Sequence, residues 1–283
     1  MNKIQFSKFS GAGNDFILID SELNPDFNLE NSVIRKICDR RNGIGGDGIL
    51  FIKKSDNYDY ELEYYNSDGS LGTLCGNGSR CSIKYAYSAK KCIGNITNFL
   101  CRGVAYKGEV FEDGMVKFFL APPELLKLNY NIYANNQSIN ISSVDTGSLH
   151  AVIRVEEILS NPDDKNSFYT EIDELPVYKI GKEIRFLKDF EKGINVNFIQ
   201  IKNDVIYIRT FERGVEDETF ACGTGSTAAA LISSLLYNLK SPVKVITLSG
   251  QTLTVEFEYK ENSFNNVALI GPAKEVFTGY IHL

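Results

Sequence analysis

A five-residue pattern, Cys-Gly-x-Gly-Ser, occurs twice and is the feature that most limits how this chain can fold. It begins at Cys75 and again at Cys222, so the two copies lie about half of the 283-residue chain apart. The segment after each copy has helical spacing, with Cys81, Tyr85 and Ala89 on one face after the first copy and an almost uniformly apolar run after the second. We interpret the motif as a supersecondary unit that places Cys-Gly-x-Gly-Ser at the start of a helix in each half.

The rest of the chain has mostly the patterns of short strands and hairpins. Residues 60–65 alternate as a half-buried strand does, and hairpin turns are expected at Asp113-Gly114, at Asn203-Asp204 and at Gly250. A further helix is expected within residues 32–41. This mixture predicts an α+β fold.

The length and the repeat together favour two domains. A chain of this size with 43% hydrophobic residues can bury one large core or two of ordinary size. Two prolines break the strand pattern within residues 120–128. We place the boundary there, so that the first domain is 1–121 with a returning C-terminal strand, 272–283, and the second is 122–271.

Charge and hydropathy exclude several classes of protein. Thirty basic against thirty-six acidic residues give a net charge of −6, which offers no basic surface for nucleic acid. No signal-peptide core and no apolar run of membrane-spanning length occurs, so a cytoplasmic protein without a membrane partner is expected.

The cysteines are expected to be reduced thiols. We interpret four of them as core residues and His282 as incidental, and two histidines in the whole chain give little support for a zinc site, so no metal is expected. The four core cysteines are Cys38, Cys81, Cys92 and Cys101.

The position of the other two thiols has chemical consequences. A helix start presents unpaired N–H groups and the positive end of the helix dipole, which stabilise a thiolate and can hold a carboxylate. Glycines beside each cysteine leave room for a ligand to approach the backbone. Two such starts on opposite sides of one carbon would allow one thiolate to remove an α-proton while the other thiol delivers one. The sequence therefore predicts a racemase or epimerase that needs no cofactor.

Seven motifs, in order along the chain, resemble those of diaminopimelate epimerases: FSGAGNDF, RRNGIGGDG, YNSDGS, CGNGSRC, DTGSLH, NVNFIQ and ERGVEDETFACGTGS. The resemblance covers essentially the whole chain. It implies two pseudo-symmetric domains, each a curved, barrel-like mixed sheet around a central helix, with the active site in the cleft between them. It also implies a PLP-independent isomerase that interconverts LL- and meso-diaminopimelate for lysine and peptidoglycan synthesis, and analogy with the family suggests a homodimer.

Carried over by position, the resemblance makes Cys75 and Cys222 the catalytic pair. It assigns the α-carboxylate to the N–H groups of Gly76, Asn77, Gly223 and Thr224. It assigns the far end of the substrate to Asn14, Asn66, Asn195, Glu212 and Arg213. His150 and Glu212 are expected near the thiols, where they would orient the substrate ammonium or tune the thiolates. The alternative roles are turn residues for the asparagines, an exposed ion pair for Glu212 and Arg213, and a core imidazole for His150.

Three departures from the family pattern concern substrate recognition. Ser148 stands where a substrate-binding Asn is expected, with Leu149 in place of a Pro; Gly48 stands where some members have Gln; and the segment between Arg213 and Cys222 is one residue longer. They make the substrate less certain than the reaction type.

Other functions remain as alternatives. Proline racemase-like enzymes typically show Cys-Gly-His at the first cysteine, where this chain has Asn77, and phenazine-type isomerases generally lack both cysteines. A binding protein or redox switch, with Cys75 and Cys222 forming a reversible disulfide, is the alternative from another class.

Overall fold

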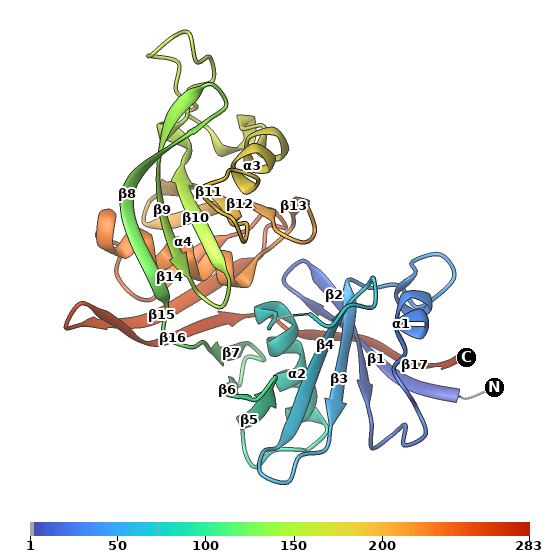
Figure 1. Ribbon diagram of the computed structural model, residues 1–283. Helices are drawn as coiled ribbons and strands as arrows, with labels where there is room; N and C mark the ends of the chain where they lie inside the picture. Colours follow the sequence, from blue (N-terminus) through green and yellow to red (C-terminus); the bar gives the residue numbers. More distant parts are fainter. Residues whose placement is uncertain (1–2, 73) are drawn as a thin grey trace. The chain divides into compact units, whose positions relative to one another are not determined.

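A computed structural model describes residues 3–72 and 74–283 (Figure 1). The chain divides into two compact units: Met1–Phe119 with Ile270–Leu283, called unit 1, and Leu120–Leu269, called unit 2. Each contains a mixed sheet and two of the four α-helices found in these residues. The predicted sheet-rich α+β class is confirmed, although the strands do not close into a barrel within the part of the chain described. None of the described helices is long and apolar enough to cross a membrane.

Unit 1 orders its strands β17-β1-β2-β3-β4-β5-β6-β7. The β2–β3 and β4–β5 pairs are parallel and the others antiparallel. The helices are the crossovers of the parallel pairs: α1 (Asn31–Cys38) joins β2 to β3, and α2 (Gly76–Ser88) joins β4 to β5. The strands are β1 (Lys3–Gly11), β2 (Asn14–Asp20), β3 (Gly48–Lys53), β4 (Tyr60–Asn66), β5 (Ile96–Cys101), β6 (Val104–Val110), β7 (Val116–Phe119) and β17 (Lys274–His282).

Unit 2 repeats this topology, with strands ordered β8-β9-β10-β11-β12-β14-β15. Here β10–β11 and β12–β14 are the parallel pairs, crossed by α3 (Val177–Arg185) and α4 (Gly223–Leu236), and β13 adds to β12. Unit 2 therefore repeats the strand order and the crossover helices of unit 1, and not only the cysteine motif. The strands are β8 (Glu124–Ala134), β9 (Gln137–Asp145), β10 (Leu149–Arg154), β11 (Asn195–Lys202), β12 (Val205–Glu212), β13 (Asp217–Thr219), β14 (Val243–Ile246) and β15 (Thr252–Lys260); β16 (Ser263–Gly271) follows.

The two motif helices are the centres of their units. Helix α2 contacts β17 and every strand from β1 to β7, and α4 packs against β9–β12, β14 and β15, with Leu231 also against Phe264 of β16. The residues from Ala228 to Ile232 on α4 are at most 1% exposed, which explains their apolar composition on every face. The expectation that this helix is buried on most sides is confirmed.

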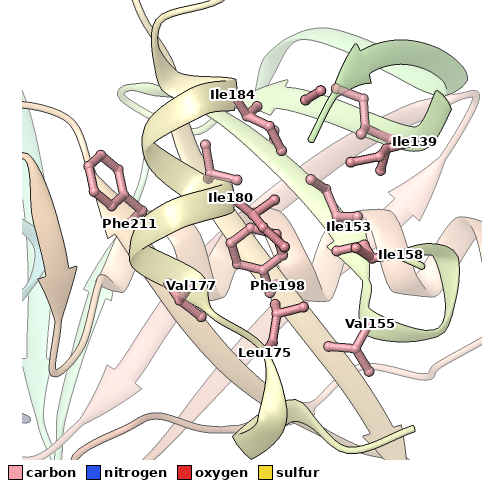
Figure 2. Packing of buried hydrophobic residues seen from close by; sticks show 14 of the residues in the cluster. Ile139, Ile153, Val155, Ile158, Leu175, Val177, Ile180, Ile184, Phe198 and Phe211 are labelled. Carbon is pink, nitrogen blue, oxygen red and sulfur yellow. The ribbon is translucent and has the colours of Figure 1, made fainter. Parts of the chain in front are cut away.

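A separate apolar core lies under α3 in unit 2. Figure 2 shows Ile180 and Ile184 of this helix beside Phe198 of β11 and Ile153 of β10. The helix approaches its sheet closely because Gly181 has no side chain: a Cβ there would lie 2.5 Å from the Cβ of Phe211.

Most of the predicted elements are confirmed, with two corrections. The strand at residues 60–65, the three hairpins and the helix after residue 31 are present. Helix α3 was not predicted, although its buried residues follow helical spacing and its counterpart α1 was expected. Cys92 is half-exposed, with its thiol 3.9 Å from the Gly94 carbonyl, so it is not the core residue expected; Cys38, Cys81 and Cys101 are buried free thiols.

The close approach at Gly181 predicts the effect of a small substitution. Alanine normally stabilises a helix interior relative to glycine. Gly181→Ala should instead destabilise the protein by about 1–3 kcal/mol, because the new methyl group overlaps Phe211. Urea unfolding measures the change, with Lys179→Ala on the exposed face of α3 as the control. Equal or greater stability of Gly181→Ala would contradict the close packing.

Candidate active site

Both motif cysteines occupy the same backbone position. Cys75 is the N-cap of α2 with φ −110° and ψ 116°, and Cys222 is the N-cap of α4 with φ −118° and ψ 113°. The N–H of Gly78 donates to Cys75 Sγ at 3.5 Å, and Cys222 Sγ lies 3.5 Å from Thr224 Oγ1. The Cys75 sulfur thus accepts an N–H of the first helical turn, while the Cys222 sulfur makes no such cap hydrogen bond and has the Thr224 hydroxyl beside it. Both cysteines lie at the N-terminus of a helix, whose dipole favours negative charge. Both helices begin directly after the cysteine, so the glycines form the first turn itself.

The glycine three residues after each motif cysteine packs closely against side chains of its own sheet. At Gly78 a Cβ would lie 2.9 Å from Leu50 Cδ2, and at Gly225 it would overlap the amide oxygen of Asn197. Both helix starts are thus pressed against strands of their own unit.

In unit 1, a chain of hydrogen bonds joins the helix start to the sheet. Asn77 Nδ2 donates to Asn14 Oδ1 at 2.6 Å, and Asn14 Nδ2 donates to Asp47 Oδ2 at 2.9 Å. Asn77 is 1% exposed, and its own oxygen accepts from Arg80 at 2.9 Å. The amide orientations of both asparagines are thereby defined, and Asn14 and Asn77, two predicted site residues, are in contact.

Asn66 and Gly48 lie at the same end of the strands as Asn14, because β2 and β3 start at this end and β4 finishes there. Asn66 pairs with Gly48 in register and donates its amide to Ser70 Oγ at 3.0 Å. A Cβ at Gly48 would lie 2.7 Å from Tyr64 Cε2 and still closer to the Tyr65 carbonyl. The position that bears Gln in some relatives has no room for a side chain here.

In unit 2, His150 is completely buried and links the sheet to the second helix start. Its Nε2 lies 2.9 Å from both Thr224 Oγ1 and Ser148 Oγ, and its Nδ1 lies 3.1 Å from Asn197 Nδ2. Thr224 is also the residue beside Cys222 Sγ. One side-chain network therefore runs from Asn197 through the imidazole to the thiol.

The network defines the tautomer of His150. Asn197 Nδ2 donates to the Ala151 carbonyl at 2.7 Å, which fixes the amide orientation, so His150 Nδ1 accepts from the amide and Nε2 carries the proton. Burial, and secondly the positive charge of Arg213, lower the pKa of His150 to about 3. At neutral pH the ring is uncharged and donates to the two hydroxyls, which leaves the Thr224 proton available to the sulfur.

Three further predicted residues lie together at the ends of β11 and β12. Asn195 opens β11 beside His150 and accepts the backbone N–H of Arg213 at 2.9 Å; its amide donates to the Leu149 carbonyl at 3.1 Å and to Ser148 Oγ at 3.3 Å. Glu212 accepts from Thr219 Oγ1 at 3.0 Å, and Arg213 donates to the Lys192 carbonyl at 2.9 Å. Unit 2 thus collects the predicted residues from Ser148 to Thr224 at one place.

The predicted residues form two groups, one per unit, and each group includes residues that sequence reasoning did not single out. Asn197, Asp47 and Arg80 hold the predicted side chains in place. Asn197 could have been found because strand alternation puts it on the same face as Asn195. No group of three or more residues able to ligate a metal occurs in residues 3–72 and 74–283.

Comparison with known families gives a match over most of the chain. The model of the family described as diaminopimelate epimerase matches residues 6–117 and 142–276. A diaminopimelate epimerase of Aquifex aeolicus is 38% identical over 289 aligned residues, covering 98% of this chain and 97% of that protein. One of Chlorobaculum tepidum is 39% identical and covers 97% of this chain and 100% of that protein.

Solved structures with the same fold are more distant in sequence. A phenazine biosynthesis protein of the PhzF family from Bacillus anthracis superposes with a TM-score of 0.71 at 13% identity, with both chains fully covered. A probable proline racemase from Agrobacterium radiobacter, with bound carbonate, has a TM-score of 0.72 at 12% identity over 99% of this chain and 93% of that one. At this identity the likeness shows the fold alone.

The buried imidazole gives a prediction for nuclear magnetic resonance. The ring signals of His150 should stay constant from pH 8 to pH 5, because its pKa of about 3 keeps it neutral throughout. The ring ¹⁵N shifts should identify the Nε2–H tautomer. The chain has two histidines, so His282→Gln assigns the signals. A titration of His150 within this range would contradict the network.

Proposed function

Because the chain belongs to the diaminopimelate epimerase family, we propose that it interconverts LL- and meso-diaminopimelate by proton transfer between two cysteines and one α-carbon. The observation that carries this proposal is the repeated N-cap cysteine: Cys75 and Cys222 have matching backbone angles at the starts of the two central helices. A duplicated base is what a reaction that inverts one carbon in both directions needs.

In the proposed reaction, one thiolate takes the α-proton and becomes a thiol. The electron pair of the broken C–H bond moves toward the α-carboxylate, and the other thiol delivers its proton to the opposite face, leaving a thiolate. The two sulfurs have then exchanged protonation states, and the next substrate of the product configuration runs the same steps in reverse. The balance requires no oxidant, reductant or prosthetic group.

The α-carboxylate is assigned to the N–H groups of Gly76, Asn77, Gly223 and Thr224. These residues occupy the first turns of α2 and α4, where backbone N–H groups point toward the helix N-terminus and can bind an anion. Charge that develops on the carboxylate as the proton leaves is stabilised by the same donors. The helix starts therefore supply both the bases and the electrostatic stabilisation.

The far end of the substrate carries an ammonium and a second carboxylate. We assign it to Asn14, Asn66, Asn195, Glu212 and Arg213, of which Arg213 can bind both oxygens of a carboxylate. Ser148 supports Asn195 and His150 through its hydroxyl. Ser148 and Gly48, where relatives can carry longer side chains, are the positions at which specificity for this end would differ.

The wider setting follows from the family and stays a prediction. It comprises PLP-independent isomerisation in lysine and peptidoglycan precursor biosynthesis, a cytoplasmic location and a homodimer.

The proposed reaction is tested by proton NMR of LL-diaminopimelate in D2O under reductant. The α-proton signal should disappear as the meso isomer forms. Cys75→Ala and Cys222→Ala should each lower the rate at least about 100-fold, since positioned acid–base groups contribute about 10²–10⁴. L-Proline in a parallel tube tests the racemase known on this fold.

The matched control is Cys92→Ser, a half-exposed cysteine outside both helix starts, which should retain the wild-type rate. Exchange of proline in place of diaminopimelate would overturn the substrate assignment. A wild-type rate in either alanine variant, or after alkylation of both thiols, would overturn the two-thiol mechanism.

A further inference from the structure

Arg80 is a charged residue buried without a carboxylate partner. Its side chain, one turn into α2, is 0% exposed. Its guanidinium donates to the Gly76 carbonyl at 3.3 Å and to Asn77 Oδ1 at 2.9 Å, while its Nε has no hydrogen-bond partner. None of the ion pairs found within residues 3–72 and 74–283 includes Arg80. A buried charge is costly unless an opposite charge compensates it.

The guanidinium remains charged at neutral pH. Burial lowers the pKa of Arg80 to about 10, and the two groups whose negative charge would oppose this decrease are the thiols of Cys81 and Cys75. Burial raises the pKa of Cys81 to about 12, so Cys81 is a neutral thiol. Gly76 and Asn77, the two residues that the guanidinium contacts, directly follow Cys75, so the guanidinium lies at the helix start that Cys75 caps. Cys75 is therefore the thiol at this helix start that can carry the compensating charge.

The nearest carboxylate along the hydrogen-bond network is already occupied. Arg80 reaches Asp47 only through the amides of Asn77 and Asn14, which donate in one direction toward the carboxylate. Asp47 itself pairs with the exposed Arg40 at 2.7 Å. The chain of amides orders the site residues and leaves the charge of Arg80 uncompensated.

The second motif lacks this charge at the equivalent position. Thr227 follows Cys222 by the same number of residues as Arg80 follows Cys75. Its hydroxyl donates to the Gly223 carbonyl at 3.0 Å, the same kind of contact that Arg80 makes with Gly76, and it is also fully buried. The two helix starts therefore have nearly the same backbone angles at the cysteine, and at this position the first has a buried positive charge where the second has a neutral hydroxyl.

We propose that the positive charge of Arg80 stabilises Cys75 as a thiolate in the resting enzyme, and that this thiolate is in turn the counter-ion of Arg80. Arg80 is then a positioning residue that acts through Cys75. This assignment rests on the proposed two-thiol reaction and adds its starting state, in which Cys75 is the base and Cys222 the acid. A substrate whose α-proton faces Cys75 meets a ready base, and its epimer requires the proton to be exchanged between the thiols first.

The test measures each thiol separately and without substrate. The reduced protein is pulsed with iodoacetamide at a series of pH values, and alkylation of the Cys75 and Cys222 peptides is read by mass spectrometry. In the wild type, Cys75 should react with a midpoint below that of an ordinary cysteine, about pH 8.5. In Arg80→Gln, which keeps an amide donor and removes the charge, this midpoint should rise by at least about one pH unit.

Two matched variants distinguish the effect of the charge from an effect on the structure. In Arg80→Lys, which keeps a positive charge, the pH midpoint of Cys75 alkylation should stay close to the wild-type value. Thr227→Val, at an equally buried position of α4, should leave the pH profile of Cys75 alkylation unchanged. Thermal unfolding checks that each variant is folded. If Arg80→Gln does not fold, the wild-type midpoint and Arg80→Lys decide the question.

Two outcomes overturn the proposal: a wild-type Cys75 midpoint at or above that of ordinary cysteine, or a low midpoint that Arg80→Gln leaves in place. The α-proton exchange of diaminopimelate is measured separately on the same wild-type sample. Exchange with an ordinary Cys75 midpoint would overturn this assignment alone. A low, Arg80-dependent midpoint without exchange would overturn the proposed function and leave the charge pairing in place.

Discussion

The packing of two glycine-containing helix starts against their sheets is the constraint on which the site depends. A Cβ would overlap the Asn197 amide at Gly225 and would press on the Leu50 side chain at Gly78, and each motif cysteine is an N-cap at nearly the same backbone angles. A larger residue would lift the helix from the sheet and move the sulfur with it. The same close packing of a glycine against its sheet therefore positions the helix start, and the cysteine that caps it, in both units.

The two units share this framework but use different hydrogen-bond partners for the polar side chains near the cysteine. Unit 1 surrounds its cysteine with a buried cation and a directed chain of amides that ends at Asp47. Unit 2 uses a neutral imidazole and two hydroxyls, ordered by Asn197. The backbone symmetry provides equivalent bases, and the side chains make their electrostatic surroundings unequal.

The repeat in the sequence predicted much of the fold, because Cys-Gly-x-Gly-Ser before helical spacing determines both the crossover helix and its N-cap. Helix α3 was missed since its polar face and Gly181 weaken the local pattern, while its buried face is completed by residues of distant strands, such as Phe198 and Phe211. The same holds for the site. Motifs indicated Cys75, Asn14 and His150, but the part played by Asn197 depends on contacts with His150 and Ala151, which are distant in the sequence. The burial of Arg80 likewise depends on the strands packed around α2.

The pairing of β17 with β1 has a consequence for the folding of the chain during its synthesis on the ribosome. Unit 1 takes its edge strand from residues 274–282, so unit 2 is inserted between the first seven strands of unit 1 and the eighth. During translation all strands of unit 2 up to β15 leave the ribosome while β1 still has one edge without a neighbour. The unit that begins first is therefore completed last, and its open edge must be kept from other chains until synthesis reaches the end of β17.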